Sequence, residues 1–214
     1  METVDLRREL RHLYQPKPGR FELVTVPQLS YLTITGQIEP GAGPSDSPGF
    51  DAALQAIYGL AYTLRFALKK RSERPLDAPV MPLEAQWWLT GGTFDLAHPD
   101  NWAYRLMIAI PDQVGQDDVD SALATLRAKR GDSAELDRLR LERIAEGDCV
   151  QVLHLGPYST EPATLAGLPE FLAAQGLVDM VETRPHSEIY LSDPRRTAPE
   201  KLRTILRHPV ARLA

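Results

Sequence analysis

The segment that decides the fold is residues 47–71, SPGFDAALQAIYGLAYTLRFALKKR. Its apolar residues recur at alternating intervals of four and three, which places them on a single stripe of an α-helix. They are Phe50, Leu54, Ile57, Ala61, Leu64 and Leu68. Ser47 can cap the first turn, Pro48 suits the first helical position, and Lys69-Lys70-Arg71 suits a helix C-terminus. The sequence therefore predicts one long amphipathic helix here.

Strand patterns lie on both sides of this helix. Runs rich in β-branched and aromatic residues predict four strands, at Phe21–Val26, Tyr31–Gly36, Leu83–Thr90 and Trp102–Ile110. Pro27 separates the first two strands, and a further helix is expected to begin at Asp117. Residues 1–20 are charged and then interrupted by prolines, which predicts a short helix or a loose arm.

The second half of the chain repeats this order of elements. Strands are expected at Leu139–Ile144, Cys149–Leu155 and His186–Ser192, with a helix running to Gly176 and a last helix through Ile205. The pseudo-repeats span roughly residues 21–130 and 138–214, which favours duplication of a strand–helix–strand–strand module. We therefore predict an α+β fold whose uncovered sheet faces form a central ligand groove between the halves.

Composition excludes several classes of protein. The 214 residues carry a formal net charge of -5, which does not favour binding to nucleic acid. Cys149 is the single cysteine, so an internal disulfide is excluded. No apolar run has transmembrane length and no signal-peptide hydrophobic region lies near Met1, so we expect a cytoplasmic protein without membrane contact. Because the histidines lack metal-ligand spacing and no phosphate-binding glycine motif occurs, we expect no metal and no cofactor.

The expected strand at His186–Ser192 carries the first candidate site, because its polar and apolar residues alternate. One face then holds Ser187, Ile189 and Leu191, and the other holds His186, Glu188 and Tyr190. A carboxylate between an imidazole and a phenol is either part of a solvated exterior or the polar wall of a pocket. The pattern alone leaves both open.

A second candidate lies in Leu83–Leu89. Alternation places Leu83, Ala85, Trp87 and Leu89 opposite Glu84, Gln86 and Trp88. We expect the apolar set to pack against helices, so that Glu84 and Trp88 share the groove side with Glu188. Trp87 and Trp88 are both candidate ligand contacts, although a core position suits Trp87 better.

Three further side chains are candidate ligand contacts. Tyr104 lies in the strand Trp102–Ile110, whose two faces are both largely apolar and cannot be told apart. Tyr158 follows a Gly-Pro turn and either reaches the mouth of the groove or packs at a strand end. His186 is included because alternation places it beside Glu188.

A carboxylate enclosed by aromatic rings has two chemical uses. Loss of water raises its pKa towards the range of acid or base catalysis. Alternatively it stays ionised and holds a cation that also stacks on the rings, at about 0.5–2 kcal/mol per cation–π contact. Both uses require the same residues, so Glu188 remains a candidate for either.

At these residues the chain resembles the stand-alone GyrI-like small-molecule-binding proteins, in particular their cyclopropanoid hydrolase-like branch. The resemblance rests on segments that span nearly the whole chain: Leu13–Lys17, Ala56–Phe66, Pro82–Trp88, Trp102–Ile108, His154–Thr164, Glu188–Arg196 and Pro199–Leu202. It implies one GyrI-like domain over residues 21–214, with a groove lined by aromatics around a glutamate that Glu188 matches. Ala85 and Gln86 depart from the family pattern beside Trp88.

The resemblance also implies a function. Such a protein binds hydrophobic, aromatic or cationic drug- or toxin-like molecules and can hydrolyse cyclopropanoid genotoxins for detoxification. Glu188 would then act as general base, and Tyr190 or Tyr158 would donate a hydrogen bond to the developing oxyanion. The alternatives are a non-catalytic ligand sensor or sequestering protein and, ranked last, a DNA gyrase inhibitor, for which no sequence feature indicates an interface.

Overall fold

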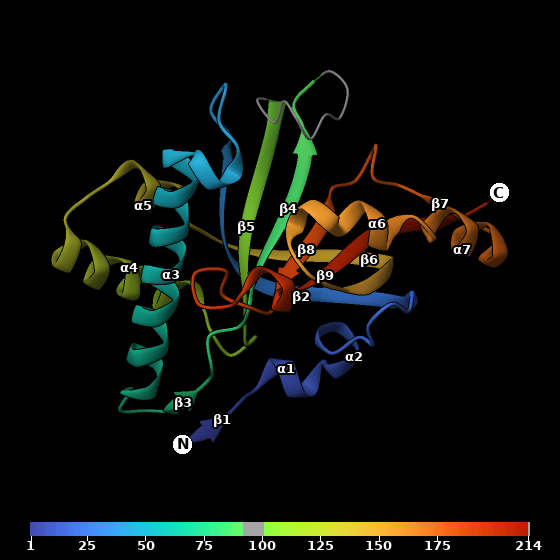
Figure 1. Ribbon diagram of the computed structural model, residues 1–214. Helices are drawn as coiled ribbons and strands as arrows, with labels where there is room; N and C mark the ends of the chain where they lie inside the picture. Colours follow the sequence, from blue (N-terminus) through green and yellow to red (C-terminus); the bar gives the residue numbers. More distant parts are fainter. Residues whose placement is uncertain (92–100, 214) are drawn as a thin grey trace. The chain divides into compact units, whose positions relative to one another are not determined.

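The computed structural model describes residues 1–91 and 101–213, and the chain divides into two compact units (Figure 1). Unit 1 comprises Met1–Glu9, Leu29–Met81 and Leu89–Ile144, and unit 2 comprises Leu10–Gln28, Pro82–Trp88 and Ala145–Ala214. Among the described residues, no helix is both long enough and apolar enough to cross a membrane.

The elements follow one another in mixed α and β order. The strands are β1 (Glu2–Thr3), β2 (Glu22–Gln37), β3 (Leu76–Asp77), β4 (Leu83–Leu89), β5 (Trp102–Ile110), β6 (Arg140–Leu155), β7 (Leu177–Asp179), β8 (His186–Tyr190) and β9 (Arg203–Arg212). The α-helices are α1 (Leu6–Glu9), α2 (Arg11–Tyr14), α3 (Pro48–Lys69), α4 (Gln116–Arg130), α5 (Ala134–Arg138), α6 (Glu161–Leu165) and α7 (Leu168–Gln175). The fold belongs to the α+β class. In the first half the order is β2, α3, β4 and β5, and in the second half it is β6, α6 with α7, β8 and β9.

Unit 1 is built on the long helix α3. Ser47 caps it, because its hydroxyl accepts a hydrogen bond from the amide of Phe50 at 3.0 Å, and Pro48 occupies the first turn as expected. The helix packs against β5 and lies beside α4 (Figure 1). Within the unit, β5 pairs antiparallel with β2 from Ser30↔Ile110 to Gln37↔Ala103. Four residues of the predicted stripe, Ile57, Ala61, Leu64 and Leu68, are buried in this unit, and Leu60 is buried beside them, whereas Phe50 and Leu54 are only partly buried.

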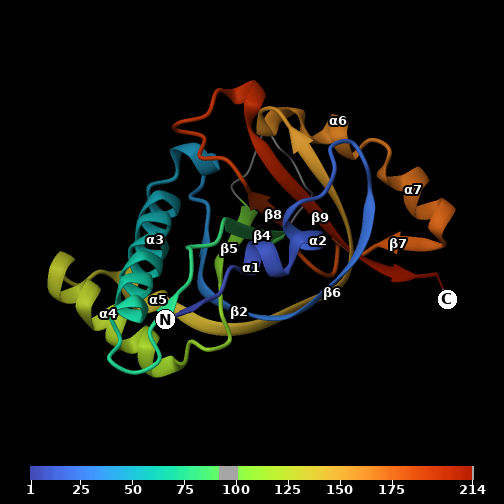
Figure 2. The ribbon, with the colours of Figure 1, turned by 90° about the horizontal axis from the view of Figure 1, so that it is seen from below.

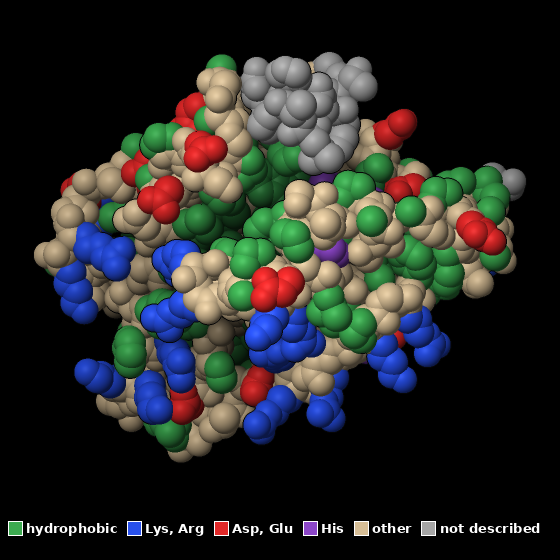
Figure 3. All heavy atoms as spheres, viewed as in Figure 1, with side chains coloured by type: hydrophobic (Ala, Val, Ile, Leu, Met, Phe, Trp, Pro, Cys, Tyr) green, Lys and Arg blue, Asp and Glu red, His purple; other side chains and the backbone are tan. Residues whose placement is uncertain are grey.

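Unit 2 is a sheet in which β8 lies between β4 and β9, both antiparallel to it. β9 also pairs with β6 and, near its end, with β7 (Figure 2). Leu168 and Leu172 of α7 pack on Val150 and Val210 of the sheet. Figure 3 shows further hydrophobic side chains on the surface over α6 and α7.

In two places where the sequence predicts two successive strands, the structure has one continuous strand. β2 runs through Pro27, whose fixed φ fits extended backbone and which removes one hydrogen-bond donor at most. β6 runs through Gly147, which takes a left-handed φ of 69° and lets the strand continue. Local turn signals were therefore overridden by the pairing of long strands.

The predicted last helix is wrong, because only a 3-10 turn at Pro199–Lys201 forms before β9. The strand gains hydrogen bonds from β6 and β8 on its two sides, which outweighs the local capping signal. The helix predicted to end at Gly176 is two helices, since Pro169 cannot donate the amide hydrogen bond that would join α6 to α7. Gly176 does end α7 in a left-handed conformation, φ 64°.

We predict that Ser47→Ala lowers the free energy of unfolding by about 1 kcal/mol, because the amide of Phe50 loses its cap. The Glu39 carboxylate, which accepts a hydrogen bond from the same hydroxyl, also loses a donor. Urea unfolding measures the change, with the exposed Ser45→Ala as the matched control. Equal stability of the two variants would contradict the assignment.

Candidate functional site

Strand β8 presents two chemically different faces, as its alternation predicts. Ser187 and Ile189 are fully buried, whereas Glu188 keeps 15% of its side chain exposed. His186 and Tyr190 are likewise half-buried. Glu188 therefore belongs to a largely enclosed face and not to a solvated exterior.

The carboxylate of Glu188 is held by its neighbours on this strand. The Tyr190 hydroxyl donates to Glu188 Oε2 at 2.7 Å, and His186 Nε2 lies 3.3 Å from Oε1. The Trp87 indole donates in turn to the Tyr190 hydroxyl at 3.2 Å. The ring of Tyr158 meets that of Tyr190 edge-on, with centroids 5.9 Å apart. Five of the predicted site residues thus meet within unit 2.

The register between β4 and β8 decides which β4 side chains face Glu188. Directly paired residues of an antiparallel pair lie on the same face, and Ala85 pairs with Glu188 while Trp87 pairs with His186. The expectation that Glu84 and Trp88 share the face of Glu188 is therefore wrong. The error lay in assigning the apolar set of β4 to helix packing, when both faces of this strand are covered.

Glu84 and Trp88 lie on the opposite face of the sheet. Glu84 is fully buried and accepts a hydrogen bond from the Tyr14 hydroxyl at 2.7 Å. Trp88 is half-buried. In this part of the molecule Glu84 connects the N-terminal arm to the sheet, which is a structural contact that the sequence did not indicate.

Tyr104 is a core residue of unit 1. It is 1% exposed, and its ring meets Phe50 edge-on with centroids 4.9 Å apart. Its hydroxyl lies where a side chain at Gly36 would collide with it, so the glycine makes room for the ring. Burial raises the pKa of this phenol, which stays protonated.

Unit 2 contains a second carboxyl group, that of Glu161, which the sequence did not indicate as part of the site. Glu161 begins α6, and its Oε1 atom is buried without a hydrogen-bond partner among the residues that the structure describes. Burial, followed by the negative charge of Glu188, raises the pKa of Glu161 to about 9. No spacing rule connects a helix start to a strand 27 positions later (188 − 161), so only the fold brings these two groups together.

A buried histidine fixes the start of α6. His154, at the end of β6, has its Nδ1 2.7 Å from the Thr164 hydroxyl and its Nε2 3.1 Å from the Pro157 carbonyl. Its strand position pairs with Thr204, which is also the partner of Tyr190, so that His154 and Tyr190 share a face. The contacts of His154 with Thr164 and Pro157 hold the segment that carries Tyr158 and Glu161 over the face of Glu188.

The carboxyl groups of Glu161 and Glu188 lie in different chemical environments. A pKa of about 9 favours the neutral acid for Glu161 at neutral pH, whereas the Glu188 carboxylate accepts a hydrogen bond from Tyr190. Burial and the nearby Glu188 raise the pKa of Tyr190 well above its usual value, so that Tyr190 remains a donor. Such a set can accept a proton, supply one, or hold a single positive charge against aromatic rings.

Other reactive groups do not join this set. Burial raises the pKa of the Cys149 thiol to about 12, which leaves it unreactive. His208 Nδ1 lies 2.8 Å from Asp179 Oδ2, and its ring lies 5.7 Å from that of His186. Within residues 1–91 and 101–213, no three potential metal ligands gather in one place.

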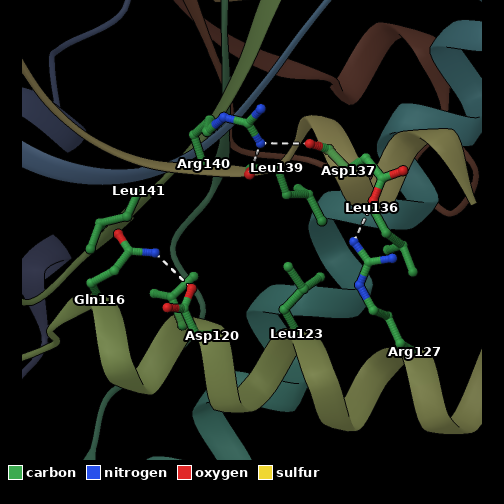
Figure 4. Close-up of a pocket in the computed structure, with 10 residues that line it drawn as sticks. Gln116, Asp120, Leu123, Arg127, Leu136, Asp137, Leu139, Arg140 and Leu141 are labelled. Carbon is green, nitrogen blue, oxygen red and sulfur yellow. Dashed lines mark hydrogen bonds and ion pairs between the residues drawn. The ribbon is translucent and has the colours of Figure 1, made fainter. Parts of the chain in front are cut away.

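Unit 1 contains a shallow pocket of about 290 Å³ between α4, α5 and the start of β6 (Figure 4). Its rim carboxylates are already engaged, since Asp137 accepts from Arg127 at 2.6 Å and Asp120 accepts from Gln116 at 2.8 Å. None of the predicted site residues lines it. The residues around Glu188 therefore remain the better candidate site.

We predict that Glu161→Gln makes the protein more stable relative to wild type as the pH rises from 5 to 9. Between the ordinary carboxyl pKa of 4.5 and about 9, the folded state keeps a proton that the unfolded state has released. Wild-type stability therefore falls with rising pH, by up to about 1.4 kcal/mol per pH unit, and the amide removes this loss.

Unfolding free energies at several pH values measure this effect, and the exposed Glu170→Gln is the control. A stability difference between Glu161→Gln and wild type that does not change with pH would show that Glu161 is ionised in the folded protein.

Comparison with known proteins places this geometry in a family. The profile of the GyrI-like small molecule binding domain matches residues 103–211. No match was found among curated protein sequences. A crystal structure of an uncharacterized conserved protein from Listeria innocua is 35% identical, with a TM-score of 0.89 and coverage of 97% of this chain and 100% of that one.

Two hydrolases from Listeria innocua are also similar. One, encoded by lin2189, is 33% identical with a TM-score of 0.84, covering 98% of this chain and 100% of its own. The other is 32% identical with a TM-score of 0.80, covering 97% and 100%. By profile, sequence identity and fold, this chain belongs to the family of the GyrI-like small molecule binding domain.

Proposed function

We propose that the face of unit 2 around Glu188 binds small molecules with a hydrophobic, aromatic or cationic body, and that it hydrolyses cyclopropanoid genotoxins. The observation that carries the proposal is the pair of carboxyl groups, Glu188 and Glu161, set among Trp87, Tyr158 and Tyr190. The two similar proteins described as hydrolases support a hydrolytic reaction.

Binding relies on the rings and on one negative charge. Tyr158 is 39% exposed and so offers its ring to a ligand, whereas Trp87 is 6% exposed and chiefly holds Tyr190 in place. A lipophilic cation gains from the charge of Glu188 and from the electron-rich faces of the rings. Because few charges are present, a planar neutral molecule can also be accommodated.

Hydrolysis requires a general base in addition to the groups that bind the ligand. Glu188 takes a proton from water as the water oxygen attacks the strained carbon, which is the role of a general base. Tyr190 and His186 orient the Glu188 carboxylate, at 2.7 Å and 3.3 Å. Tyr190 therefore supports the base, and its proton is committed to Glu188 in the ligand-free protein. A gyrase interaction is not part of the proposal.

We expect benzyltriphenylphosphonium to bind and quench tryptophan fluorescence. Tyr158→Ala should weaken binding about twofold to thirtyfold, the worth of one cation–π contact, while Tyr158→Phe should retain it. Glu188→Gln should weaken binding of the cation and leave a neutral aromatic of the same size unaffected. Equal affinity of the cation for all these variants would mean that it binds elsewhere.

We expect the purified protein to convert a cyclopropanoid genotoxin to its ring-opened, hydrated product. Glu188→Gln should lower kcat/KM by at least about 100-fold, because the general base is lost. Chromatography of the product measures the rate, with Glu170→Gln as a control of equal charge change.

Turnover by Glu188→Gln at the wild-type rate would remove Glu188 from the reaction. Binding without any product in the wild-type protein would identify the chain as a sequestering protein or a sensor.

A further inference from the structure

Beside Glu188, hydrogen bonding within the described residues leaves one buried oxygen of Glu161 unexplained. Oε1 is out of contact with water and has no hydrogen-bond partner among the described residues. A charged carboxylate in that position would lack compensation and would also face the charge of Glu188. The same oxygen carrying a proton is a hydrogen-bond donor without an acceptor. A ligand atom that accepts a hydrogen bond would supply this partner.

We propose that Glu161 is the proton donor of this site and that it selects ligands that carry a hydrogen-bond acceptor, such as a conjugated carbonyl, on a planar apolar body. This inference rests on the proposed function, because it concerns the same face of unit 2. It differs in what it requires, since donation by Glu161 can be measured without any turnover.

The groups around Glu161 support donation by this residue. Glu188 and Tyr190 face it from β8, and Tyr158 lies one turn before it in the chain. Tyr190 already donates to Glu188 at 2.7 Å, and His186 also contacts Glu188. His154 is turned towards Thr164 and Pro157. Oε1 of Glu161 has no hydrogen-bond partner among the described residues, so a proton on this oxygen is available to an incoming acceptor.

The hydrolytic step balances with this assignment. Water forms a C–O bond to a cyclopropane carbon while Glu188 removes one of its protons. The strained C–C bond breaks, its electron pair moves through the conjugated system to the carbonyl oxygen, and that oxygen takes the proton of Glu161. One water has been added, and transfer of a proton from Glu188 to Glu161 restores the site. A cyclopropane without a conjugated acceptor could not use this donor.

The first test needs no ligand. In infrared difference spectra between wild type and Glu161→Gln, we expect a protonated-carboxyl band at pH 7 that disappears as the pH passes about 9. Glu170→Gln should remove no such band, because its carboxyl is exposed. Absence of the protonated band at pH 7 would overturn the proposal.

The second test uses fluorenone and fluorene, two planar aromatics that differ in one carbonyl group. We expect wild type to bind fluorenone about two- to tenfold more tightly than fluorene, the worth of one net hydrogen bond, with the carbonyl stretch of bound fluorenone shifted to lower frequency. Glu161→Gln keeps an N–H donor and should retain both effects. Glu161→Leu should lose both, although it remains folded and binds fluorene.

Each other outcome has a definite meaning. An unchanged preference for fluorenone in Glu161→Leu would overturn the role of Glu161 and leave ligand binding intact. Binding of benzyltriphenylphosphonium but of neither aromatic would do the same. If none of the three probes binds, both the proposed function and this inference fail, and the infrared band then reports only the protonation of Glu161.

Discussion

The register of β8 against β4 and β9 is the constraint on which the site depends. Glu188 lies opposite Ala85 on one side and Leu206 on the other, so these three side chains share one face. A shift of one residue would exchange the two faces and bury Glu188 where Ser187 now lies. The face on which His186, Glu188 and Tyr190 lie therefore follows from this one alignment.

A buried polar network on the opposite face favours that register. Arg207 is 1% exposed and donates to Glu146 at 2.7 Å, to Gln151 at 3.2 Å and to the carbonyl of Leu13 at 3.0 Å. Ser187 donates to the same Glu146 carboxylate. A slip would leave an unpaired charge in an apolar environment, which is strongly unfavourable. The network also connects the N-terminal segment, predicted as a short helix or a loose arm, to the sheet through the carbonyl of Leu13, next to the short helix α2.

The sequence predicted what depends on local periodicity and missed what depends on pairing. The stripe of α3 and the alternation of β8 are properties of contiguous residues, and both are present in the structure. The face of Trp87 depends on which residue of β8 lies beside it, and β9 forms a strand because two neighbours pair with it. Alternation defines two faces of a strand but does not say which one meets a second element.

Glu161 shows the same limit in chemical terms. As a residue in the first turn of a helix it has an ordinary interpretation, since carboxylates are favourable at helix N-termini. The fold reverses that interpretation, because burial and the neighbouring Glu188 raise the pKa of Glu161. One is then suited to receive a proton and the other to supply one. In the proposed function, binding and hydrolysis would therefore use one set of residues, and a ligand would become a substrate only where it brought a strained carbon to Glu188 and an acceptor to Glu161.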